Sequence, residues 1–83
     1  MTLYQFIQLS KEAKHTTLST KGVFVDSLVI YSNPNFQYQL YAIDRFFVEL
    51  IYDLKNDNLI SISAFYESNK LNKYYNHIDI YLD

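Results

Sequence analysis

The sequence predicts a small α+β domain in which helices pack on one face of an antiparallel sheet. Apolar residues recur with helical spacing before Gly22 and with a spacing of two residues after it. Polar turns of two to four residues separate the alternating runs, and connections this short join antiparallel strands. With 83 residues the chain has room for one domain, which we expect to span residues 1–83.

Two helical segments are expected in the N-terminal part. Thr2 and Gln5 have the spacing of a capping box at the start of the first. Ser10 can cap a second helix over residues 11–21, and Gly22 suits a left-handed position directly after it. Apolar residues at i, i+3 and i+4 support the first helix: Leu3, Phe6 and Ile7.

Four strands and a C-terminal helix should complete the fold. The alternating runs that predict the strands are residues 23–31, 36–42, 46–53 and 59–66. Their turns are expected at residues 32–35, 44–45 and 55–58. The final helix should begin at Ser68 or Asn69, because apolar residues then follow at helical spacing: Leu71, Tyr74, Tyr75 and Ile78. The strands should form a meander, in which each strand pairs with the next.

Alternation assigns the strand side chains to two sheet faces. One face should meet the helices and form the core, for which we predict Phe24, Leu28, Tyr38, Leu40, Val48, Leu50, Ile60, Ile62, Leu71 and Ile78. The other should be free of helices and carry Gln37, Gln39, Tyr41, Phe47, Glu49, Ile51, Ser61 and Ser63.

Composition argues against most kinds of chemistry. The chain has no cysteine, and its single glycine cannot build a glycine-rich phosphate loop. His15 and His77 lack the dense ligand spacing of a metal site, so we expect no catalytic residue, metal or cofactor. Seven Lys and Arg against nine Asp and Glu disfavour nucleic acid as a partner. No apolar run approaches a membrane span, and we expect a cytoplasmic protein.

The aromatic content of 18% suggests a surface that binds another protein. The free sheet face would present Tyr41, Phe47 and Ile51 beside the acidic Glu49 and Asp53. We therefore predict a non-catalytic interaction or regulatory module (an inhibitor, an immunity-type protein or an adaptor) that binds a second protein or its own copy. The alternative is a small enzyme or ligand carrier with a pocket between helices and sheet, using tyrosine hydroxyls as polar contacts.

Three segments of the chain carry a family resemblance. They are residues 1–9 (MTLYQFIQL), residues 21–24 (KGVF) and residues 46–50 (FFVEL). These segments resemble a group of small uncharacterised bacterial proteins whose sequences begin MTLYxFxxL. The resemblance implies a stand-alone bacterial protein of unassigned role, and brings with it no activity, cofactor or binding residue.

Overall fold

The computed structural model describes residues 1–30, 33–66, 71 and 74 of the chain. Two helices come first, α1 (Leu3–Ile7) and α2 (Lys11–Lys21). Four strands follow: β1 (Val23–Ile30), β2 (Asn33–Ile43), β3 (Phe46–Asp53) and β4 (Asn58–Phe65). The predicted α+β class is confirmed. The predicted C-terminal helix falls outside the described residues, apart from Leu71 and Tyr74.

The N-terminal caps are those that the sequence predicts. The Thr2 hydroxyl accepts a hydrogen bond from the Gln5 backbone N–H at 3.1 Å, and the Gln5 side chain accepts one from the Thr2 N–H at 2.8 Å. At the start of α2, the Ser10 hydroxyl accepts a hydrogen bond from the Ala13 N–H at 3.1 Å. Both helices therefore begin with backbone donors satisfied by side chains.

Gly22 does not adopt the predicted left-handed conformation. Its φ of −75° and ψ of 146° are extended values open to any residue. A close approach of two backbone segments accounts for glycine here, because a Cβ atom would lie 2.7 Å from the Leu18 carbonyl oxygen. That oxygen accepts a hydrogen bond from the Gly22 N–H at 3.0 Å. The glycine lets β1 leave the end of α2 without a clash.

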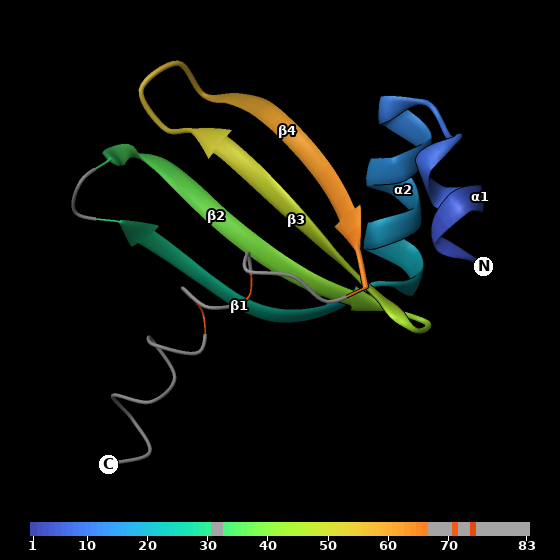
Figure 1. Ribbon diagram of the computed structural model, residues 1–83. Coiled ribbons are helices and arrows are strands. Elements are labelled where there is room, and N and C mark those ends of the chain that lie inside the picture. Colours follow the sequence, from blue (N-terminus) through green and yellow to red (C-terminus); the bar gives the residue numbers. More distant parts are fainter. Residues whose placement is uncertain (31–32, 67–70, 72–73, 75–83) are drawn as a thin grey trace, which may run out of the picture.

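Four strands form one antiparallel sheet in the order β1-β2-β3-β4 within the described part of the chain. Figure 1 shows α1 and α2 packed together at the end of the sheet where β4 finishes. The predicted β2–β3 turn at Asp44 and Arg45 is confirmed, with Asp44 at a φ of 51° that aspartate tolerates. Three of the residues predicted to form the turn at 32–35 belong instead to β2, which begins at Asn33, and the fourth lies outside the described residues.

The register of the β2–β3 hairpin overturns the predicted assignment of β2 to a face. Ile43 lies opposite Phe46, and Ala42 lies opposite Phe47. Directly opposed residues share a sheet face, so Tyr41 and Ile43 lie on the side of the helices. The prediction that Tyr38 and Leu40 face the helices is wrong, because a two-residue turn pairs Ile43, rather than Ala42, with Phe46.

Both sheet faces consequently carry a core. On the first face the helices cover a cluster of Leu3, Phe6, Leu18, Ile43, Phe46, Val48 and Leu50. On the second face Leu71 and Tyr74 pack with Leu40, Leu28, Tyr38, Phe47 and Phe65. Phe24 and Ile60, which we predicted to be core residues, are 54% and 48% exposed. Phe24 lies on edge strand β1, and Ile60 has no partner in the β3–β4 register.

Candidate functional site

A buried carboxylate lies at the centre of the second sheet face. Glu49 on β3 is 2% exposed. Its cross-strand neighbours are Leu40 of β2 and Ser63 of β4. Burying an ionised group in apolar surroundings is costly unless hydrogen bonds compensate. Glu49 accepts a hydrogen bond of 2.9 Å from the hydroxyl of Tyr74, which is itself 1% exposed. This contact fixes Tyr74 on the sheet.

The same surroundings control the ionisation of Tyr74. Burial, reinforced by the charge of Glu49 and by the hydrogen bond to it, raises the pKa of Tyr74 far above that of a free tyrosine. The Asp26 carboxylate on β1 acts in the same direction. Tyr74 therefore keeps its proton at neutral pH and donates it in the hydrogen bond to Glu49.

The interaction surface predicted from the sequence does not form one exposed face. Tyr41 packs against the core beneath the helices, and Glu49 is buried on the opposite face. Phe47 is half-buried and stacks on Phe65, with ring centres 6.1 Å apart. Ile51 and Asp53 are also half-buried, and the Asp53 carboxylate accepts hydrogen bonds from the turn that follows it. An exposed patch built from these five residues was a wrong prediction.

Apolar exposure gathers instead along β1, an edge strand of the sheet. Val23, Phe24, Val25 and Val29 are 65, 54, 43 and 47% exposed. Strand edges present backbone N–H and C=O groups that can pair with another strand, and apolar side chains there favour such pairing. The sequence contained a usable signal for this surface, because the first strand of a meander always lies at a sheet edge.

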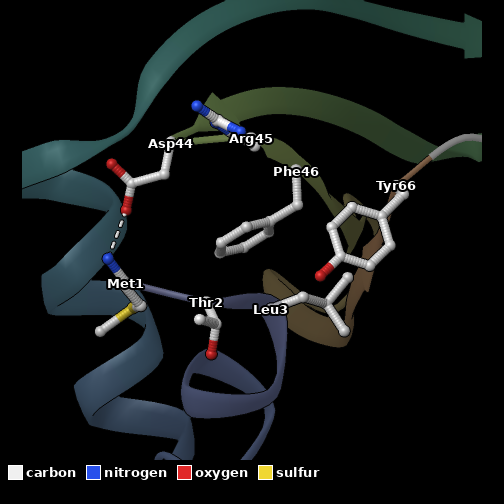
Figure 2. Close-up of a pocket in the computed structure, with 7 residues that line it drawn as sticks. All are labelled: Met1, Thr2, Leu3, Asp44, Arg45, Phe46 and Tyr66. Atoms are coloured by element: carbon white, nitrogen blue, oxygen red, sulfur yellow. Dashed lines mark ion pairs between the residues drawn. The ribbon is translucent and has the colours of Figure 1, made fainter.

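A pocket of about 500 Å³ lies between the start of α1 and the β2–β3 turn (Figure 2). Residues 1–3, residues 44–46 and Tyr66 line it. On one side the Met1 ammonium forms an ion pair of 2.8 Å with Asp44, and a hydrogen bond from that ammonium lowers the pKa of Asp44. Leu3 and Phe46 line the bottom of the pocket, and they leave little apolar surface for a ligand because they are 7% and 2% exposed.

Other kinds of site find no support in the part of the chain that the structure describes. Among residues 1–30, 33–66, 71 and 74, no group of three or more His, Cys, Asp or Glu side chains is placed to hold a metal ion. No helix within these residues is long and apolar enough to cross a bilayer. No protein-family model, curated protein or solved structure matches the chain.

Proposed function

We propose that this chain is a non-catalytic protein-interaction module whose contact surface is edge strand β1. The carrying observation is the exposure of 43–65% at Val23, Phe24, Val25 and Val29. These side chains lie on both faces of the strand, since Val23 is opposite Ala42 and Phe24 is opposite Tyr41. What they share is the sheet edge, where exposed apolar residues favour pairing with another strand. An extended segment of a partner would extend the sheet by pairing with β1, so that main-chain hydrogen bonds supply affinity and side chains supply selectivity.

Two substitutions with matched exposure test this proposal. Val29 on β1 is 47% exposed, and Ile60 on the opposite edge strand, β4, is 48% exposed. Val29→Lys places a charge in the proposed contact, and Ile60→Lys places the same charge outside it. Proteins captured from cells that express this chain should be lost with Val29→Lys and retained with Ile60→Lys. Equal capture by both variants and the wild type would exclude β1 as the contact surface.

The specific roles that the sequence suggested (inhibitor, immunity-type protein or adaptor) would use the same surface on β1. Inhibitor, immunity-type and adaptor proteins all act by covering part of another protein, so a contact surface on β1 suits each of them. A cytoplasmic location and a bacterial origin stay predictions from composition and resemblance. The gene beside this one in its genome would identify the partner class most directly, since an adjacent toxin gene would favour an immunity role.

A ligand-binding role is the second candidate, and one observation favours it. The pocket beside α1 lies between helix and sheet, with the ring of Tyr66 along its side (Figure 2). A volume of about 500 Å³ is within the range of small-molecule sites. Its Met1 ammonium is already paired with Asp44, and its floor is nearly all buried. Arg45, Thr2 and Tyr66 are the polar side chains left on its lining. We rank this role below protein binding because the pocket offers a ligand little exposed apolar surface.

A further inference from the structure

A hollow runs along the outer side of β4, beside the first turns of α2. Lys11 and Lys14 line it from the helix, and residues 60–62 line it from the strand. Successive side chains of a strand point to opposite faces, so a hollow that touches three residues in a row lies along an edge of the strand. The other edge of β4 is paired with β3, which makes this the open edge of the sheet.

Lys11 reaches the backbone of β4 at this edge. Its Nζ donates a hydrogen bond of 3.2 Å to the Leu59 carbonyl oxygen, although the two residues are 48 positions apart. Lys11 and Leu59 also line a second hollow between helix and strand. A strand that added itself to an edge would need the backbone acceptors there. The ammonium of Lys11 occupies one of them and places a positive charge beside residues 60–62.

The backbone of β4 is irregular next to this contact. Ile60 has no partner in the β3–β4 register, although Leu59 and Ser61 on either side of it do. An extra residue of this kind is a β-bulge, which bends an edge strand and interrupts regular pairing. The Lys11 hydrogen bond falls on the residue directly before the bulge. Both features therefore act on the same stretch of the open edge.

β4 itself supplies no charge to protect its edge. Its eight residues, all of them described, have the sequence NLISISAF, which contains neither a charged residue nor a proline. Uncharged segments with strong strand propensity are the ones most prone to pair with other chains. The opposite edge strand, β1, has four exposed apolar side chains. The β1 of one copy could add to an unprotected β4 of the next, and such a head-to-tail contact repeats from copy to copy.

We infer that Lys11 closes the β4 edge to strand pairing and leaves β1 as the edge to which an extended segment can add. The inference goes beyond the proposed function, because it concerns the opposite edge of the sheet and the number of partner strands that one chain can take. A chain with one open edge takes one partner strand, and the complex cannot grow. This role needs the ammonium at β4, rather than the positive charge of α2 in general.

Sedimentation velocity over a concentration series tests the inference with two matched substitutions. Lys11→Met keeps an unbranched side chain of similar length and removes the ammonium. Lys21→Met makes the same change of charge at the other end of α2, where the side chain is also exposed. A double variant, Lys11→Met with Ile60→Lys, returns a charge to the β4 edge from the strand itself, because Ile60 is 48% exposed. Circular dichroism of Lys11→Met should match the wild type, since a loss of helical signal would assign Lys11 to the stability of α2 instead.

We expect Lys11→Met to assemble into larger species at a concentration severalfold lower than the wild type requires. Lys21→Met should sediment like the wild type, and the double variant should return to wild-type behaviour. Unchanged sedimentation of Lys11→Met, an equal effect of Lys21→Met, or assembly that persists in the double variant would each overturn the inference. The capture experiment with Val29→Lys reads the β1 edge, so it still decides the proposed function in each of these cases.

Discussion

Glu49 and Tyr74 form the contact between the sheet and the described C-terminal residues. The tyrosine hydroxyl donates to a carboxylate that is 2% exposed, so neither group gives up water without compensation. Leu71, 4% exposed, packs in the same cluster. The pair thus adds a directional contact to an otherwise apolar face, and it selects one position for Tyr74 on the sheet.

Removal of the Tyr74 hydroxyl should therefore be costly. We expect Tyr74→Phe to lower the free energy of unfolding by about 1–3 kcal/mol, because a buried carboxylate loses a hydrogen bond. Urea denaturation measures the change. Tyr66→Phe is the control, since Tyr66 is 51% exposed and its substitution should change stability by less than about 0.5 kcal/mol. Equal effects of the two substitutions would contradict a stabilising role for the Glu49–Tyr74 hydrogen bond.

Alkaline pH should weaken the same contact. The pKa of Tyr74 is raised in the folded protein by burial and by Glu49, whereas in the unfolded chain it lies near its ordinary value of about 10. The stabilisation is fully present below about pH 10 and is lost as the pH rises above it, because the unfolded chain then releases a proton that the folded chain retains. The free energy of unfolding of Tyr74→Phe should fall less steeply with rising pH than that of the wild type in this range. Parallel pH dependences of stability in the two proteins would argue against a raised pKa of Tyr74.

At the scale of elements, α2 depends on one side chain. Of the residues of α2, all of which the structure describes, Leu18 is the buried one, at 3% exposure. Thr16, Thr17, Ser19 and Thr20 are weak helix formers, so packing must supply most of the stability of this helix. The Ser10 cap and the close contact between Gly22 and Leu18 define its two ends.

Leu18→Ala should consequently release α2 from the sheet. We expect a loss of about 2–5 kcal/mol, as in other large-to-small core substitutions, and a fall in helical circular dichroism. Thr16→Ala at an exposed position of the same helix should leave stability within about 0.5 kcal/mol of the wild type. A helical signal that survives Leu18→Ala unchanged would mean that α2 is stable without this anchor.

Local patterns predicted the elements well and their mutual arrangement less well. The bounds of α2 and β3 agree with the sequence, because Ser10 and a clean alternation mark them. The assignment of β2 to a face was wrong because it did not take the length of the following turn into account. The two-residue turn at Asp44 and Arg45 was predicted correctly, and it already requires Ile43 to share a face with Phe46. The burial of Glu49 was beyond prediction, since it depends on Tyr74, a residue 25 positions away in sequence.

At the scale of the whole molecule, two cores on opposite faces share the strands between them. Val48 and Leu50 point toward the helices, while Phe47 and Glu49 of the same strand point toward Leu71 and Tyr74. Because side chains of a strand alternate between the two sheet faces and both faces of β3 are covered, β3 contributes to both cores. Four of the five residues of the interaction surface that we first predicted lie on this second face, and Tyr41 lies on the other. Leu71 and Tyr74 pack against Phe47 on the second face, and Tyr74 bonds to Glu49 there. Four exposed apolar side chains lie along β1 instead.

The meander order has a consequence for how the chain folds. Each strand pairs with the next after a connection of a few residues, so the sheet can form one hairpin at a time at a small cost in loop-closure entropy. Contact between α1 and β4 is different, since it joins residues 3–7 to residues 58–65 and can form only when the sheet exists. In stopped-flow experiments Val48→Ala should slow folding, whereas Leu3→Ala should chiefly speed unfolding. We therefore expect α1 to be the last element added during folding and the first lost during unfolding, and the opposite pattern would mean that α1 docks early.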